Sequence, residues 1–157
     1  MSAPGLVRQR VALLSTATAI LVLSLACGVE QKQSGLPSGA QSAIDNITSD
    51  LARGDHEKIY TEAAEEWRQT ASADESRAHL QRIRNALGQV LSRAQLSAQV
   101  SEQDNIDSTR SSRTQRTLVV GYNTKFERAD AIETFTLIER QGRWLLARYA
   151  VNSNALK

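Results

Sequence analysis

The sequence has a single cysteine, Cys27, and this excludes an internal disulfide from the fold. Disulfides are common in exported proteins, but here the cysteine has no structural partner within its own chain. A free reactive thiol and an intermolecular bridge are two roles that stay open for Cys27. Its position in the chain suggests a third.

The chain also lacks an apolar run of the length that is typical of a membrane-spanning helix. Its N-terminal uncharged segment, residues 11–26, has sixteen residues and includes four Ser or Thr. A spanning helix needs about 20 predominantly apolar residues. This segment follows the basic residues Arg8 and Arg10 and ends in small residues, which is the layout of a secretory signal peptide. We therefore expect residues 1–26 to be a signal peptide, with an uncleaved membrane anchor as the alternative.

The residues around the cysteine indicate its role. The stretch Ser24-Leu25-Ala26-Cys27 resembles the lipobox of bacterial lipoproteins. The resemblance implies that the Cys27 thiol receives a diacylglycerol and that Cys27 becomes the new amino terminus after cleavage. Because acyl chains contribute about 0.8 kcal/mol per buried CH₂, we expect a stable lipid anchor in the bacterial cell envelope, facing outside the cytoplasm. Gly28 after the cysteine indicates the periplasmic leaflet of the outer membrane if the envelope is Gram-negative.

The processed chain would have no excess of charge of either sign. The whole sequence has 19 Lys and Arg against 17 Asp and Glu, and loss of residues 1–26 removes Arg8 and Arg10 and no acid. Nucleic-acid-binding proteins usually carry a basic patch or stripe. We therefore expect no nucleic-acid partner.

Motifs of common catalytic and metal sites are missing as well. Neither His56 nor His79 lies in a zinc motif such as H-E-x-x-H, and the sequence has no G-x-S-x-G motif and no glycine-rich phosphate loop. The sequence thus predicts no catalytic residue, no metal and no cofactor.

The spacing of apolar residues predicts helices followed by strands. Residues 27–38 form a flexible tether, residues 39–152 a single domain and residues 153–157 a C-terminal tail. Three helices are expected: from the N-cap Ser38 to Gly54, from the N-cap Asp55 to about Arg68, and from the Ser72–Glu75 capping box to Gly88. Strands are expected at residues 90–100, 117–126, 131–139 and 143–152, with a polar loop at residues 101–116. In the first strand apolar and polar residues alternate, which puts Arg93 on a wet face. This order predicts an α+β fold whose N-terminal helices pack on a curved antiparallel sheet of about four strands.

Two segments carry a family resemblance. They are "ALGQVLSRAQLSAQ" and "YNTKFERADAIETFTLIERQGRWLLARY", and they resemble the bacterial family called domain of unknown function 4019, roughly over residues 40–152. The matching positions are Gly88, Ser92, Arg93, Tyr122, Phe126, Glu133, Thr134, Trp144 and Tyr149. The resemblance implies a cone-shaped fold of the cystatin-like or nuclear transport factor 2-like kind. Because the family has no established activity, it implies no catalytic residue.

Glu133 is the most informative residue of the predicted sheet. A three-residue hairpin loop at residues 140–142 would place Glu133 opposite Tyr149, on the same face as Phe135. A carboxylate there is costly to bury without a donor, so it should reach solvent or meet a donor in a pocket. Arg148 would point to the opposite face, so it is not the simple partner. We expect a structural hydrogen-bonding role for Glu133, with a role in a pocket as the alternative.

Two functions of different classes fit the sequence. The first is a non-enzymatic module that binds another protein or a small ligand. The alternative is a small-ligand carrier or an enzyme that uses a cavity between helices and sheet. The candidate lining of that cavity is Tyr60, Trp67, Tyr122, Glu133 and Tyr149. A deep cavity with a desolvated acid would favour the alternative, and a filled interior would favour the first function.

The last two predicted strands have apolar residues on both faces. The predicted register puts Phe135, Leu137 and Leu145 on one face, and Ile132, Ile138, Trp144 and Leu146 on the other. Helices cover one face only, so the other should bury against a second copy, a partner or its own curled sheet. A homodimer through the sheet face is therefore one expected assembly.

Overall fold

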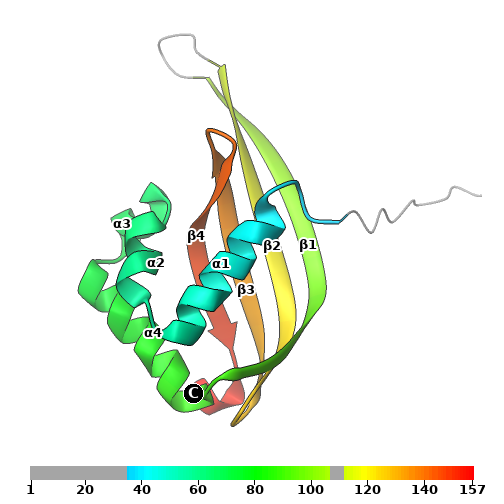
Figure 1. Cartoon of the computed structure of the whole chain (residues 1–157). Coiled ribbons are helices and arrows are strands. Elements are labelled where there is room, and N and C mark those ends of the chain that lie inside the picture. The colour runs from blue at the N-terminus through cyan, green and yellow to red at the C-terminus, as the bar shows by residue number, and fades with distance from the viewer. Residues whose placement is uncertain (1–34, 107–111) are drawn as a thin grey trace, which may run out of the picture. The chain divides into compact units, whose positions relative to one another are not determined.

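Helices pack against one face of a four-stranded antiparallel sheet in the computed structural model, which describes residues 35–106 and 112–157 (Figure 1). The predicted α+β fold is confirmed. The predicted signal peptide, the lipobox and Cys27 lie outside the described residues. No helix within the described ranges is long and apolar enough to cross a membrane.

Helix α1, Ala40–Arg53, buries Ala40 and Ile44 against the sheet. It ends as predicted at Gly54, whose left-handed conformation lets its N–H bond to the carbonyls of the last turn. The predicted N-cap Ser38 is wrong, because the N-cap is Gly39 and no side chain caps the helix.

The single helix predicted after Gly54 is two helices, α2 (His56–Glu62) and α3 (Glu65–Thr70). Between them Ala63 and Ala64 have extended backbone conformations. The Ala64 N–H donates to the carbonyl of Leu146 in the sheet at 2.9 Å, and the Arg68 guanidinium donates to the carbonyl of Ala63 at 2.7 Å. These two hydrogen bonds replace bonds of a continuous helix. Alanine favours helices, so the two alanines themselves give no sign that the helix breaks here.

Helix α4, Ala73–Leu87, confirms the predicted third helix. Ser72 and Glu75 form the predicted capping box, and the helix ends at Gly88. The apolar stripe of Leu80, Ile83 and Leu87 is buried in the core.

The sheet consists of β1 (Val90–Ile106), β2 (Ser112–Phe126), β3 (Asp130–Arg140) and β4 (Arg143–Asn152), in that spatial order. The predicted polar loop at residues 101–116 is wrong, because β1 and β2 stay paired from Ser101 with Thr117 to Ile106 with Ser112. This part of the ribbon extends past the helices (Figure 1). Because no helix covers this part of the sheet, neither of its faces has to be apolar. Its sequence is therefore polar and lacks the alternation that would predict a strand.

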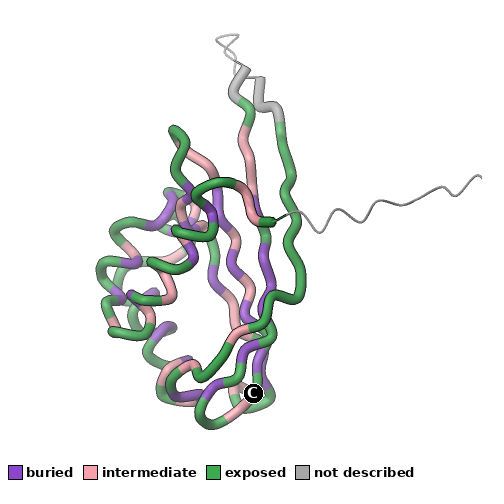
Figure 2. The backbone as a smooth tube through the Cα atoms, turned by 45° about the vertical axis from the view of Figure 1, so that its right-hand side comes forward, coloured by how far each residue is buried: buried purple, intermediate pink, exposed green. Residues whose placement is uncertain are grey.

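Strand β1 does not follow the alternation predicted for it. Its pairing with β2 shifts at two bulges, one at Leu91 and one at Leu96, and both leucines are exposed. The first bulge turns Arg93 to the helix-facing side of the sheet, opposite Thr124, although the sequence predicted it on the wet face. Most of β1 beyond Arg93 is exposed, as the right-hand strand of Figure 2 shows.

The hairpin between β3 and β4 also differs from the prediction. Arg140 pairs with Arg143, so the loop has two residues, Gln141 and Gly142, and not three. A further bulge then shifts the register, so that Phe135 pairs with Tyr149 and Glu133 with Val151, in place of the predicted partners. The side chains of Trp144 and Leu146 consequently join Phe135 and Leu137 in the core, so the predicted division of apolar residues between the two faces is wrong for both.

After β4 the chain forms a short 3₁₀ helix, Asn154–Leu156, which contacts α4. Leu156 packs against the core, so this part of the predicted C-terminal tail belongs to the folded unit. The core as a whole lies between the helix layer and the helix-facing side of β2, β3 and β4 (Figure 2).

Candidate functional site

Glu133 lies on the helix-facing side of β3 and is completely buried, with 0% of its surface exposed. Its carboxylate accepts four hydrogen bonds. The Arg93 guanidinium donates from Nε to Oε2 at 2.5 Å and from Nη2 to Oε1 at 3.0 Å. The hydroxyls of Thr124 and Tyr149 complete the set, at 2.5 Å to Oε2 and 2.6 Å to Oε1. Each carboxylate oxygen therefore has two donors.

The four residues of this cluster come from four different strands: Arg93 from β1, Thr124 from β2, Glu133 from β3 and Tyr149 from β4. The bulge at Leu91 brings Arg93 to the same side as Thr124, and the bulge in the β3–β4 pair places Tyr149 opposite Phe135, two residues along β3 from Glu133. The register of the whole sheet thus sets the geometry around the acid. We call these four residues the Glu133 cluster.

The electrostatics of the cluster favour a fixed ion pair. Arg93 forms the two-pronged contact that suits a carboxylate, and 21% of its side-chain surface is exposed. Burial lowers the pKa of the Arg93 guanidinium, but its hydrogen bonds to Glu133 and the charge of Glu133 outweigh this, so that the pKa is raised. Burial, and then the charge of Glu133, raise the pKa of the Tyr149 hydroxyl well above its usual range. Neither group releases a proton near neutral pH.

A cavity of about 180 Å³ lies beside the cluster, between α1, α2, α4 and the sheet. For comparison, an apolar cavity of about 150 Å³ holds a benzene molecule. Tyr149 and Arg93 form part of its wall, and most of the rest is apolar. The lining residues are Thr48, Leu51, Ala52, His56, Leu80, Ile83, Arg84, Gly88, Gln89, Val90, Arg93, Phe126 and Tyr149.

His56 and Arg84 are the other groups in the wall that carry or can carry a positive charge. His56 is 6% exposed, and among the described residues its ring has no hydrogen-bond partner. Burial, and then the charge of Arg84, lower the pKa of the His56 ring, so the ring is neutral at pH 7 and offers one donor and one acceptor. Arg84 donates from Nη1 to the carbonyls of Leu51 and Ala52, at 3.0 and 2.7 Å.

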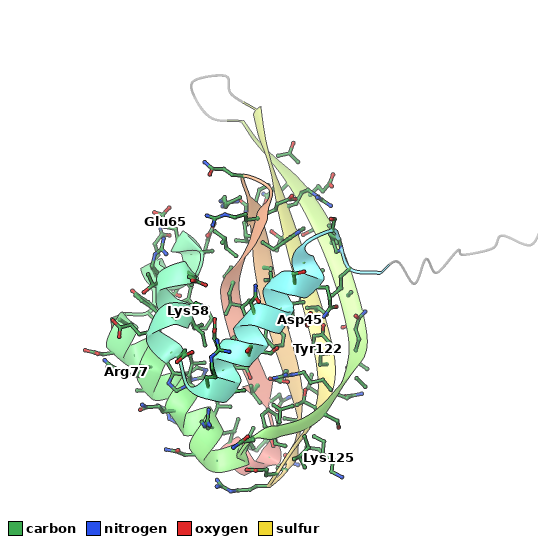
Figure 3. The ribbon with its side chains drawn as sticks, viewed as in Figure 1. Asp45, Lys58, Glu65, Arg77, Tyr122 and Lys125 are labelled. Atoms are coloured by element: carbon green, nitrogen blue, oxygen red, sulfur yellow. The ribbon has the colours of Figure 1, made fainter. Side chains whose placement is uncertain are left out.

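The residues proposed from the sequence as pocket lining take different places. Tyr149 lines the cavity, and Glu133 lies behind it, in contact with Tyr149. Tyr122 pairs with Glu133 across β2 and β3 and packs edge-on against Phe135, with ring centroids 5.9 Å apart. Burial, and then the charge of Asp45 on α1, raise the pKa of the Tyr122 hydroxyl; Figure 3 labels both side chains.

Tyr60 and Trp67 lie away from this cavity. The Trp67 indole donates to the Ser76 hydroxyl at 2.8 Å and fixes α3 to α4, and Tyr60 is half-buried on α2. Sequence reasoning did not propose Arg93, His56 or Arg84 for the cavity. A buried acid in the same sheet, Glu133, was the available signal for Arg93, but β2 lies between their strands and the bulge that turns Arg93 inward has no sequence signature.

Within residues 35–106 and 112–157, no group of three His, Cys, Asp or Glu side chains is arranged to hold a metal ion.

The comparison with protein families agrees with this domain. A family described as "Protein of unknown function (DUF4019)" matches residues 43–149, which is more than half of the chain. The chain belongs to the DUF4019 family. The DUF4019 match includes the whole Glu133 cluster and every residue that lines the cavity. A search of curated proteins found no match.

Proposed function

We propose that this protein is a lipid-anchored, non-enzymatic module of the bacterial envelope that binds a small, largely apolar ligand in the cavity between its helices and its sheet. The observation that carries the proposal is the cavity itself. It has a volume of about 180 Å³ and a mainly apolar wall, together with a histidine, His56, whose ring has no partner among the described residues. Sites for small molecules combine these features: a concave apolar wall and a few polar groups that orient the ligand.

The state of Glu133 argues against catalysis in this cavity. A general acid or base has to reach the substrate and exchange a proton with it. Both oxygens of Glu133 are fully occupied by donors, and Glu133 is separated from the cavity by Tyr149, whose own hydroxyl bonds to it. The cluster supports the wall of a binding site and offers no proton to a substrate.

An enzyme that uses the cavity is the second candidate, and His56 is the observation in its favour. Its ring is neutral near pH 7, lines the cavity and is free to accept a proton. Neither Ser, Cys, Asp nor Glu is among the lining residues, and the one aliphatic hydroxyl in the lining, that of Thr48, donates to the Asp45 carbonyl at 3.0 Å. His56 therefore has no hydrogen-bonded nucleophile to activate and no carboxylate in the lining to orient it. Binding is therefore the preferred function.

The anchoring part of the proposal rests on the sequence around Cys27, which lies outside the described residues. Replacing Cys27 with Ser removes the thiol that would carry the lipid. We expect the Cys27→Ser protein to lose metabolic labelling with a palmitate analogue and to accumulate as an uncleaved precursor. A variant that is labelled like the wild type would refute the anchor.

The binding part is tested by blocking the cavity. Ala52 lines the cavity and is exposed to solvent, so Ala52→Trp should block access to it. Ala78→Trp introduces the same side chain at an exposed position of α4 that does not line the cavity. We expect benzene, titrated into the full-length protein, to shift the NMR signals of the residues around the cavity in a saturable way. The shifts should be lost in Ala52→Trp and kept in Ala78→Trp. The absence of saturable shifts in the wild type would overturn the proposal.

A further inference from the structure

The wall of the cavity has side chains that carry or can carry a positive charge, and it has no acid. These side chains are Arg84, Arg93 and His56, and neither Asp nor Glu lines the cavity. An uncharged ligand would need no such wall. The question is which of these charges is available to a ligand.

Arg93 is already neutralised by Glu133, but Arg84 is not neutralised by any acid. Its Nη1 atom bonds to two backbone carbonyls at the end of α1, and its other N–H groups have no partner among the described residues. Two acids that adjoin lining residues are engaged elsewhere. Asp55 accepts from Arg53 at 2.8 Å, and the Glu127 carboxylate accepts the Gln89 N–H at 2.9 Å.

We propose that the ligand of this cavity is a small amphipathic carboxylate, whose apolar body packs against Leu51, Leu80 and Ile83 and whose carboxylate binds Arg84 and His56. This inference rests on the proposed function and specifies the ligand class for the same cavity. A guanidinium with free N–H groups offers the paired donors that a carboxylate prefers, and the His56 ring supplies a further donor. The volume suits an alkyl chain of about six carbons, since a slightly smaller cavity holds benzene.

The proposal has a consequence for pH. The groups that act on the His56 ring are Arg84 and Arg77, whose positive charges oppose protonation, and Asp55, whose charge favours it. A carboxylate bound beside the ring adds a negative charge and raises the pKa of His56 in the complex above that in the free protein. Binding then takes up a proton, so affinity should increase as the pH falls from 7.5 to 6, where an alkyl carboxylate stays ionised.

The test uses three probes with the same chain length: hexanoate, 1-hexanol and hexylammonium. They are titrated into the full-length protein in detergent micelles, with binding followed by NMR shifts at the cavity and empty micelles as the blank. We expect hexanoate to bind at least tenfold more tightly than hexanol, and hexylammonium to bind most weakly. Equal affinity for hexanoate and hexanol would overturn the carboxylate inference but leave the proposed function intact. Binding of none of the three would overturn the proposed function itself.

Variants test which side chains bind the carboxylate of the ligand. Arg84→Gln should weaken hexanoate binding at least fivefold and leave hexanol binding within twofold. Arg82→Gln is the matched control, because Arg82 is exposed on the same helix and does not line the cavity; it should change neither affinity. Because Arg84 also bonds to the carbonyls at the end of α1, retained hexanol binding shows that Arg84→Gln is folded. A second variant tests His56. His56→Gln should abolish the increase in hexanoate affinity between pH 7.5 and 6, and an unchanged pH dependence would overturn the assignment of His56.

Discussion

Arg93 donates two hydrogen bonds to the carboxylate of Glu133, at 2.5 Å from Nε and 3.0 Å from Nη2, and the two residues lie on strands that are not neighbours in the sheet. The contact passes over β2 and ties the edge strand β1 to β3. Strand β1 is bulged at Leu91, and its outer edge is unpaired within the described sheet. This ion pair is therefore a main side-chain link that holds the N-terminal half of β1 against the core.

We predict that Glu133→Gln lowers the free energy of unfolding by about 2 to 3 kcal/mol, because it removes charge-assisted hydrogen bonds from a completely buried group. Glu139→Gln is a matched control on the same strand. Glu139 is also paired with an arginine, Arg116, but both side chains are partly exposed, so its loss should cost less than about 1 kcal/mol. Urea denaturation measures both. A Glu133→Gln protein with unchanged stability and lost ligand binding would show that the acid serves the ligand and not the fold.

Arg93→Met should be more damaging than Glu133→Gln. It leaves the carboxylate of Glu133 buried without its counter-charge, a situation that typically costs about 3 to 5 kcal/mol. In the double variant Arg93→Met/Glu133→Gln no uncompensated charge remains. We therefore expect the double variant to be no less stable than Arg93→Met alone, so that the two effects are far from additive. Additive losses in urea denaturation would mean that the two side chains act independently.

The parts of the fold that the sequence predicts correctly depend on local signals. Gly54 and Gly88 end helices, and Ser72 with Glu75 starts one, because each acts through its own backbone or through residues three positions away. The parts that it misses depend on distant partners. The break at Ala63 and Ala64 is fixed by the hydrogen bond from the Ala64 N–H to the carbonyl of Leu146, which lies far along the chain, so no local pattern predicts it.

The candidate site shows the same limit. The sequence predicts that the Glu133 carboxylate either reaches solvent or meets a donor, and the structure shows the second. Its contact with Tyr149 exists although the predicted pairing was wrong by two positions. Arg93 was missed because strand alternation assigns it to the wet face. One bulge residue, Leu91, reverses the alternation, and a bulge is fixed by pairing across the sheet and by packing.

The two-residue loop between β3 and β4 offers a stabilising substitution. Gln141 and Gly142 both have positive φ, 52° and 74°, as in the tight hairpin turns that prefer Asn followed by Gly. Gln141 is exposed and its conformation is unfavourable for a long side chain. Gln141→Asn should therefore raise the free energy of unfolding by about 0.5 to 1 kcal/mol, in the range of substitutions that fit a turn better. Gln141→Val, which resists positive φ, should lower it, and the opposite order would refute the assigned turn.

Association of two copies through the outer face of the sheet stays a prediction. Fewer apolar residues lie on that face than the sequence predicted. Trp144 and Leu146 belong to the core, and the large exposed side chains on the outer face of β2 and β3 are Val119 and Ile132, at 39% and 41% exposure. If this face joins two copies, Ile132→Lys should convert the dimer to monomer, while Gln99→Lys on the edge strand β1 should have a smaller effect. Light scattering of the wild-type protein that detects monomer alone would remove the homodimer.

The pH dependence of stability should report the burial of His56. Burial, and then the charge of Arg84, hold the pKa of His56 in the folded protein below its value of 6.5 in the unfolded chain, so the unfolded chain takes up a proton first as the pH falls. The stability that the neutral ring contributes is complete above about pH 6.5 and is lost as the pH falls from there towards the folded-state pKa. His56→Gln should therefore flatten the decline in unfolding free energy below pH 7.

His79 serves as the control, because it is the other histidine and its pKa is also lowered by burial and by the charge of Arg82. His79 is exposed, so His79→Gln should flatten the decline less. A decline that is equally steep in His56→Gln and the wild type, measured by urea denaturation from pH 7.5 to 5.5, would show that the cavity holds the charged ring without cost.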